Sequence, residues 1–524
     1  MSIVPGIRMS DIYDVVIIGS GFAGSLLAMI AKQIGRSVLL LERNAHPRMM
    51  IGESSTPLSN LLLEELAITY RLPDLLPFTK WGTWQQHHPE VGCGLKRGFS
   101  FFHHDLENAG NEPSDNEMLV AASPHDQIAD THWYRADFDH WLVSSAQQHG
   151  VTYLDEVTLR RYTEADDYVV LSGERNQKDI QFRCRFVIDA TGPRGCLHHL
   201  LGLHEADMSA MPATKALYSH FSHVGRLDDF TSSQYPDSPP YPIDDAAVHH
   251  VFDGGWVWVL RFNNGITSAG VAATESAADR LGLREGAGAW TRLLEKMPTL
   301  QRQFAEAVPL HPFTYLPRLA FRSGTMTGKR WAMLPSAAGF VDPLLSSGFP
   351  LALLGISRLA RILDLHWNQS TFAAELLAYE QSTDGELLAT SRLIGALYAN
   401  MNNFEAFRAI SLLYFAAASY SETARRLSKP ERANSFLMHT DPKFGPEVEI
   451  LLRRAAKGVT YSETKEFVSA VKKAIEPFDV AGLCASPRNH WYPVNAEDLR
   501  RAAWKVGATT EEIDSMLQSS GFYV

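Results

Sequence analysis

The apolar and polar positions near the N-terminus follow the pattern of a strand, a helix and a second strand. An apolar run, DVVIIG, precedes a glycine turn, a segment with apolar residues at helical spacing follows, and a second apolar run ends in LLLER. Short apolar runs around a helix are typical of a βαβ unit with buried strands. Similar runs recur in FVIDATG and RWAMLPSAAGF, so we expect one α/β lobe that the chain leaves and re-enters.

The segments between these runs carry other patterns. A helix is predicted over residues 57–68, followed by glycine-punctuated strands, and runs such as AVHHVF and GWVWVLRF predict a second, mostly antiparallel sheet. Beyond about residue 375 the pattern is helical. We therefore predict an α/β (α+β) protein. Its discontinuous first domain lies within residues 1–375 (about 10–55, 130–205 and 325–375), with an inserted sheet (about 56–129 and 206–324) and a helical C-terminal region over 376–524.

Composition narrows the possible partners. Hydrophobic residues make up 45% and charged residues 20% of the 524 positions, as in a globular protein, and the net charge of −11 argues against nucleic acid. No apolar run reaches the roughly 20 residues that span a bilayer, and MSIVPGIRMSD at the N-terminus lacks a signal pattern, so we expect a cytoplasmic protein without a membrane span. The four cysteines lack CxxC spacing and the paired histidines lack metal-site spacing, so no metal site is expected.

The glycine turn has the GxGxxG spacing of a dinucleotide site. Its residues follow a strand and open a helix: Gly19, Ser20, Gly21, Phe22, Ala23 and Gly24. In this context the backbone can approach a pyrophosphate, and the helix N-terminus supplies amide donors. Glu42 ends the second strand, where a carboxylate accepts hydrogen bonds from a ribose diol and disfavours a 2'-phosphate. FAD or NAD therefore fits better than NADP. The alternative is a glycine turn without a ligand.

Three further segments select among dinucleotide proteins. These are FVIDATGPRG, LPSAAGFVDPLLSSGFPLAL and GESSTP. Together with the glycine turn they resemble the flavin-dependent halogenases, a branch of the FAD monooxygenase superfamily, over roughly residues 12–365. The resemblance implies a Rossmann-like FAD-binding domain beside an antiparallel substrate domain.

The resemblance also implies roles for individual residues. The pyrophosphate of FAD would lie at Gly19, Gly21, Phe22, Ala23 and Gly24, the ribose at Glu42, and other parts of FAD at Ser54, Arg135, Asp189, Ser336, Asp342 and Gly348. Halide would lie at Ser346, Ser347 and Gly348, because amides ahead of a helix form an anion site without a formal charge. For Arg135 a salt bridge to Asp137 or Asp139 is the structural alternative. Pro335 and Ser336 depart from the family, where Gly-Asp contacts the ribityl chain.

Lys96, in GLKRGFSFF, resembles the family lysine that handles hypohalous acid. Strand alternation would place it with Gly98 and Ser100, small residues that leave room for a ligand, and opposite Phe99. A cationic amine there can hydrogen-bond hypohalous acid, whereas a neutral amine can itself be halogenated, and burial decides between them. The alternative is a solvated strand lysine. Lys80 is a second candidate, for which cation-π packing or anchoring of a loop is the expected role.

Glu53 is the second candidate catalytic residue, able to orient flavin or to direct a water. A structural role explains the neighbouring residues equally well: an N-cap at residues 54–56, followed by Pro57.

Two positions depart from the family pattern. The WxWxIP signature is reduced to Trp256 and Trp258 followed by Leu260 and Arg261, and paired tryptophans on a strand are also common in cores. The tryptophan-specific members carry a glutamate where this chain has Leu345. The missing carboxylate favours the phenol- and pyrrole-type members.

The resemblance implies an enzyme that uses FADH2 and O2. Halide would attack a flavin hydroperoxide, and the resulting hypohalous acid would place chloride or bromide on an electron-rich aromatic substrate, free or tethered to a carrier protein. No second GxGxxG motif is present, so we expect a separate flavin reductase. A hydroxylase or oxidoreductase of the same fold, and a flavoprotein without turnover, are the alternatives.

Overall fold

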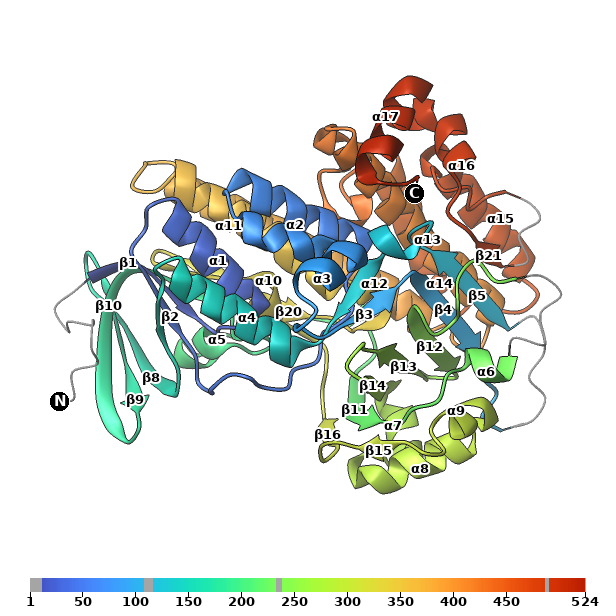
Figure 1. Ribbon diagram of the computed structural model, residues 1–524, viewed down its shortest axis with the longest axis horizontal. Coiled ribbons are helices and arrows are strands. Elements are labelled where there is room, and N and C mark those ends of the chain that lie inside the picture. The colour runs from blue at the N-terminus through green and yellow to red at the C-terminus, as the bar shows by residue number, and fades with distance from the viewer. Residues whose placement is uncertain (1–11, 108–115, 232–237, 486–489, 524) are drawn as a thin grey trace.

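The computed structural model describes residues 12–107, 116–231, 238–485 and 490–523. The N-terminal stretch on which the expectation of no signal pattern rests, residues 1–11, lies outside these residues. The described part contains two large sheets. Apart from the helices that cover these sheets, most helices belong to the C-terminal end of the chain (Figure 1). The α/β class predicted from the sequence is confirmed, whereas the domain boundaries stay a prediction.

The first sheet has a parallel centre built from segments far apart in the sequence. In spatial order its parallel strands are β19 (Trp331–Met333), β10 (Lys178–Asp189), β1 (Ile12–Ile18), β2 (Val38–Leu41) and β7 (Thr152–Leu154), and β7 forms one edge. On the other side the sheet is extended by β18 (Thr327–Gly328), β8 (Val157–Glu164) and β9 (Val169–Arg175). Central strands of a parallel sheet are buried on both faces, which explains the unbroken apolar runs.

Helices cover this sheet because their apolar residues need the same burial. α1 (Phe22–Gln33) packs against α4 (Arg135–Gln148) and α11 (Gly348–Leu365), and α11 in turn packs against α2 (Pro57–Thr69). These helices lie together on one side of the sheet in Figure 1. The helix predicted at residues 57–68 is confirmed within one residue. As a result α1 and α11, the two helices that follow the predicted cofactor turns, lie side by side.

The second sheet is mostly antiparallel, as the alternating runs predict. Its order is β15 (Val308–Pro309), β11 (Thr214–Ser222), β14 (Ile266–Thr274), β13 (Gly255–Arg261), β12 (Ala247–Phe252), β4 (Gly98–His103), β5 (Glu117–Ala121) and β21 (Trp491–Tyr492), with β16 (Thr314–Leu316) also on β11. The β12–β4 and β5–β21 pairs are parallel. The apolar face of this sheet packs on α7 (Glu275–Leu281), α8 (Ala287–Glu295) and α9 (Pro298–Gln303).

A small two-stranded sheet is formed by strands that lie, in the sequence, between strands of the two large sheets. It joins β3 (Cys93–Lys96) to β6 (Asp130–Trp133) in antiparallel register, with Lys96 opposite Asp130. On its other edge β6 pairs with residues 53–55, through Ser55 N to Thr131 O (3.1 Å) and Trp133 N to Glu53 O (2.6 Å). β3 ends at Lys96 and β4 begins at Gly98 in a different sheet. The continuous strand alternation predicted across Lys96 is therefore wrong.

The C-terminal region is helical, as predicted. Its helices are α12 (Phe372–Tyr398), α13 (Phe404–Arg426), α14 (Phe444–Ala455), α15 (Thr464–Ile475), α16 (Ala496–Arg501) and α17 (Thr510–Ser520). α13 contacts α2, so this region packs on the first lobe. Among the described residues no helix is both long and apolar enough to cross a membrane.

Gly24 is required by close packing of α1 on β1. A Cβ atom built there lies 1.9 Å from Gly19 O, so Gly24→Ala is expected to lower the melting temperature by about 5 °C or more. The matched control is Gly288→Ala on the exposed face of α8, where the nearest atom is a flexible Arg292 nitrogen at 3.5 Å. Alanine favours a helix there. Differential scanning fluorimetry of both variants checks this, and equal melting temperatures for the two would contradict it.

Candidate active site

The glycine turn folds as a cradle between β1 and α1. Gly19 has a φ of +100° and lies against the backbone of Ala190, which leaves no room for a side chain. A Cβ atom at Gly21 lies 3.3 Å from Arg135 Nη2 and 3.7 Å from Arg48 Nη2. α1 begins at Phe22, whose ring contacts Trp133 and Phe349, and Ala23 is buried. The turn therefore places a helix N-terminus beside two guanidinium groups, a combination that suits a pyrophosphate, with the Asp139 carboxylate also next to Gly21.

Arg48 has one side-chain nitrogen free. Its Nη2 donates to Glu42 Oε2 (3.1 Å), whereas Nε is buried and has no protein partner. Arg135 is held by both oxygens of Asp139 (2.7 Å each) and donates to Gly52 O (2.9 Å). The salt bridge that was the structural alternative for Arg135 is thus present, and it holds the guanidinium beside Gly21. An unpartnered nitrogen at such a cradle fits a phosphate oxygen.

Glu42 is buried at the end of β2. Its carboxylate accepts hydrogen bonds from Ser20 N (3.0 Å) and from the amides of Arg43 and Asn44 (2.8 and 3.1 Å). Burial raises the pKa of Glu42, but Arg48 and these donors together hold it below its ordinary value. A carboxylate ionised in this way can accept the hydroxyls of a ribose.

Asp189 and Ser336 lie at the same end of the sheet. Asp189 is fully buried and accepts from Thr191 N, Thr191 Oγ1 and Leu197 N (2.9, 2.6 and 2.6 Å). Burial raises the pKa of this carboxyl group. These contacts set the conformation of the turn at residues 190–192, so Asp189 would affect a bound cofactor through the backbone of that turn. Ser336 lies in the short helix α10 (Pro335–Ala338), directly after β19.

The turn before α11 combines strain with an open helix start. Leu345 and Ser346 both have positive φ (65° and 55°), a conformation that non-glycine residues rarely adopt and that is concentrated at functional sites. Ser346 and Ser347 are buried, whereas Gly348, the first residue of α11, is exposed and has open space where a side chain would project. The first amides of a helix have no intrahelical partner, so this turn presents N–H groups suited to flavin and halide.

Asp342 is held by a hydrogen-bond chain to the first tryptophan of the WxW motif. Tyr398 OH donates to Asp342 Oδ2 (3.0 Å) and Trp256 Nε1 donates to Tyr398 OH (3.2 Å). Asp342 also accepts Leu344 N (3.0 Å). Burial raises the pKa of Asp342 to about 7. Trp256 therefore supports the strained turn, whereas Arg261, which replaces the family proline, donates to Gly225 O and Val224 O at the other end of β13.

Residues 52–56 link the dinucleotide cradle to the predicted lysine. Gly52 O accepts from Arg135, and Glu53 Oε1 lies 2.7 Å from His220 Nε2, both side chains being almost fully buried. Ser54 Oγ accepts from Lys96 Nζ, and Thr56 caps α2 with Pro57 at its first position. The predicted N-cap is therefore confirmed. An extended chain spans at most about 3.6 Å per residue, so Gly52 and Ser55 are no more than about 11 Å apart.

Lys96 is one of the largest fully buried side chains in the described part of the protein. Nζ donates to Ser54 Oγ (2.8 Å) and Ser55 O (2.5 Å) and lies 3.9 Å from the centre of the Phe99 ring. The alternative of a solvated strand lysine is wrong. Burial lowers the pKa of Lys96 to about 7, against an opposing effect of Asp130. The amine therefore exists in both charge states near neutral pH.

Asp130 has the complementary shift. Burial raises the pKa of Asp130 to about 7, and Lys96 opposes this. Burial, followed by the charge of Lys96, lowers the pKa of His132 and His249 to about 3, so both rings are neutral at pH 7. Lys96 and Asp130 thus titrate together, and the two histidines near them, His132 and His249, carry no charge at pH 7.

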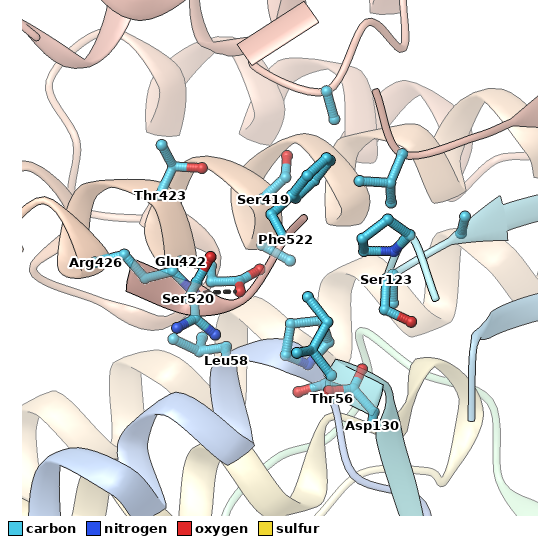
Figure 2. A pocket seen from close by; sticks show the side chains of 18 of the residues that line it. Thr56, Leu58, Ser123, Asp130, Ser419, Glu422, Thr423, Arg426, Ser520 and Phe522 are labelled. Atoms are coloured by element: carbon cyan, nitrogen blue, oxygen red, sulfur yellow. Dashed lines mark hydrogen bonds and ion pairs between the residues drawn. The ribbon is translucent and has the colours of Figure 1, made fainter. Parts of the chain in front are cut away.

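A pocket of about 180 Å³ lies next to this pair. Figure 2 shows its polar residues, with Asp130 and Thr56 from one side and Glu422, Thr423 and Arg426 of α13 from the other. Aromatic walls come from Phe99, Tyr414 and Phe415. The C-terminal segment closes the pocket, because Lys80 Nζ donates to Ser520 O (3.2 Å). Lys80 is thus an anchor for another segment, one of its two expected roles.

Several residues of this site carry no sequence motif. These are Arg48, Asp130, His220 and Tyr398. The hydrogen-bond partners of Asp130, His220 and Tyr398 are 56 to 167 positions away in the chain, so no local spacing signals these contacts. Arg48 lies six positions from Glu42 but belongs to no motif. A buried carboxylate opposite Lys96 was foreseeable only from the register of β3 with β6. Among the described residues no group of three or more His, Cys, Asp or Glu side chains could hold a metal.

The two sheets, the glycine cradle and the free Arg48 nitrogen define an FAD-dependent oxidoreductase. Residues 121–407 match the tryptophan halogenase family, and the chain belongs to this family of flavin-dependent enzymes. It is 28% identical to tetracycline 7-halogenase of Kitasatospora aureofaciens, covering 78% of this chain and 73% of that protein. It is also 28% identical to monodechloroaminopyrrolnitrin halogenase PrnC of Pseudomonas fluorescens, covering 77% and 71%.

A solved structure shares the fold. The crystal structure of halogenase PltM in complex with phloroglucinol and FAD superposes with a TM-score of 0.76, covers 92% of this chain and 99% of that chain, and is 23% identical. The family relationship predicted from the sequence is confirmed, and with it the flavin cofactor. The roles of individual residues stay predictions.

Arg48 is expected to contribute to FAD affinity through its unpartnered nitrogen. Arg48→Met removes a charge-assisted hydrogen bond and should raise the Kd for FAD about tenfold. Arg43→Met, at an exposed position in the same loop, is the matched control and should leave the Kd unchanged. Quenching of FAD fluorescence during titration with each apoprotein measures both. An unchanged Kd in Arg48→Met would remove Arg48 from the cofactor site.

Lys96 is expected to titrate near pH 7. NMR of protein labelled with [6-13C]lysine, with the signal assigned by Lys96→Arg, should give a midpoint near the value of about 7. Asp130→Asn should lower the midpoint further, because the negative charge of Asp130 raises the pKa of Lys96. A midpoint for Lys96 above about 9 would show that its amine is solvated.

Proposed function

We propose that this protein uses reduced FAD, O2 and chloride or bromide to halogenate an electron-rich aromatic ring, with Lys96 as the residue that delivers the halogen. The observation that carries the proposal is the position of the buried amine. It is bound to Ser54 and Ser55, on the segment that joins the dinucleotide cradle to the lysine, and it contacts Phe99 on the wall of the pocket.

Reduced FAD, when bound, supplies with O2 the oxidising power that converts halide to hypohalous acid. The chain's own residues do the rest. The N–H groups before α11 hold halide in the strained turn. Ser54 and Ser55 orient Lys96, which in its charged form donates a hydrogen bond to the oxygen of hypohalous acid and makes the halogen more electrophilic. The closed, apolar pocket holds the ring and excludes water that would compete for the halogen.

The finer assignments belong to the same proposal. Glu53, paired with His220, orients the segment that carries Ser54. A separate flavin reductase delivers reduced FAD, since the sequence holds one GxGxxG motif. The substrate is a small aromatic molecule, and its tethering to a carrier protein stays a prediction, as does the cytoplasmic location.

Replacing Lys96 is expected to separate flavin chemistry from halogenation. With an independent reductase, O2, bromide and a phenolic acceptor, Lys96→Ala should lose product at least about 1000-fold. The reason is that Lys80, the lysine among the described lining residues, already donates to Ser520 O. Reduced FAD should still be oxidised at a rate close to that of the wild type. Lys215→Ala, a strand lysine in ion pairs with Glu275 and Asp279, is the matched control.

Mass spectrometry of the product and absorbance of the flavin measure the two rates. Halogenated product from Lys96→Ala at the wild-type rate would remove Lys96 from the mechanism. Hydroxylated product that forms without halide would overturn halogenation itself.

A further inference from the structure

Asp130 presents an unpartnered acceptor to the pocket. Its Oδ1 accepts a hydrogen bond from Asn60 Nδ2 (2.8 Å), whereas Oδ2 is buried and has no partner. Asp130 is 5% exposed and belongs to the lining of the pocket, on the same side as Thr56 (Figure 2). A buried carboxylate oxygen without a donor is costly, so this oxygen is suited to a donor that the pocket's occupant brings.

Lys96 does not fill this role. Its amine is directed to Ser54 Oγ, Ser55 O and the Phe99 ring, and among the described residues no ion pair within 4.0 Å joins it to Asp130. The charges of Lys96 and Asp130 interact through the protein interior, although the two side chains are not in contact. Asp130 also differs from Glu422 of α13, another carboxylate of the lining, which is already paired with Arg426 (2.8 Å); the third, Glu64, lies on α2.

The rest of the pocket favours a flat ring. Phe99 and Phe415 meet edge to face at 5.3 Å and line it together with Tyr414 and Val120. A ring held against these walls can direct a donor group to Asp130, and Lys96 Nζ lies 3.9 Å from the centre of the Phe99 ring that forms one of the walls. Leu345 lies where the tryptophan-specific enzymes have a carboxylate, so that turn supplies no base.

We infer that Asp130 is the general base of the halogenation and that the substrate is a phenol whose ring-activating hydroxyl donates its hydrogen bond to Asp130 Oδ2. This inference rests on the proposed function and specifies its substrate class. A hydroxyl that loses its proton to a carboxylate pushes electron density into the ring positions ortho and para to it. A ring ether cannot donate a hydrogen bond, so the same carboxylate gives it no such activation.

The step is balanced as follows. The ring carbon forms a bond to the halogen of hypohalous acid while the halogen–oxygen bond breaks, and its electron pair leaves with the oxygen. The charged Lys96 amine gives a proton to that oxygen, so that water is released. The phenol proton moves to Asp130. The carbon that has gained the halogen then loses its own proton to the neutral Lys96 amine, and Asp130 returns its proton to the phenol oxygen, which restores the aromatic ring and the starting charge states. Hypohalous acid is the oxidant, and the ring is oxidised.

The charge states of the pair are compatible with this step. It converts a charged lysine and a charged aspartate into a neutral lysine and a neutral aspartic acid. Burial brings the pKa of both side chains to about 7, so the two states of the pair lie close in free energy. A base with a pKa raised above the ordinary aspartate value is also stronger toward a phenol.

The test compares two aromatic acceptors, phloroglucinol and 1,3,5-trimethoxybenzene. The first has ring hydroxyl groups that can donate a proton, and the second has methyl ethers in their place. The complete system of protein, FAD, reductase, O2 and bromide is used, and monochlorodimedone traps free hypohalous acid. In Asp130→Asn, kcat for bromination of phloroglucinol should fall about 100-fold. Its rate with trimethoxybenzene and its rate of trapped hypohalous acid should stay within about threefold of the wild type.

Asp126→Asn is the matched control, a carboxylate four positions earlier that is paired with Arg97 outside the pocket, and it should act as the wild type on both rings. If Asp130→Asn does not fold, Asp130→Ser is used in its place, and the ratio of its bromination rates with the two acceptors is measured. Equal losses on both rings, or no loss on either, would overturn the role of Asp130. Wild-type protein that produces hypohalous acid but does not brominate phloroglucinol would overturn the substrate class, whereas failure to produce hypohalous acid would overturn the proposed function.

Discussion

The burial of an amine and a carboxylate opposite each other in one strand pair constrains the rest of this site. Removing Lys96 and Asp130 from water penalises both charges, and their attraction offsets this only in part, since they make no direct contact. The surrounding contacts from Ser54, Ser55 and Asn60 hold each group in place. A lysine that sits in such an interior changes charge near neutral pH, which a solvated lysine does not. The chemistry that we assign to Lys96 depends on this burial.

The segment 52–56 ties that interior to the cofactor site. One end is fixed by Arg135 through Gly52 O, the middle is paired with β6, and the other end starts α2 through the Thr56 cap. A displacement of Arg135 is therefore expected to reach Lys96 through backbone that is hydrogen-bonded on both sides. The strained turn before α11 is held in a comparable way by Tyr398 and Trp256. The tryptophan that identifies the family in the sequence thus has a structural task, the support of Asp342.

The features that could be predicted from the sequence are those with local spacing. The βαβ unit follows from apolar runs around a helix, the cradle from GxGxxG, and the cap of α2 from Thr56 and Pro57. The resemblance to the family then drew attention to Lys96. The strand alternation around Lys96 was wrong, because the chain changes sheets at Arg97, whose amide donates to Asp245 O. Local periodicity cannot report such a change of partner.

By itself the sequence determined the α/β class, the dinucleotide turn and the family, because each rests on residues close together in the chain. The tertiary structure alone decided that Lys96 is buried, that Asp130 faces it and that the C-terminal segment closes the pocket over both. Strands β3 and β6 are more than 30 positions apart, and their register sets which side chains are opposite. The pKa of each group follows from that register and from the depth of burial, which are properties of packing between distant segments.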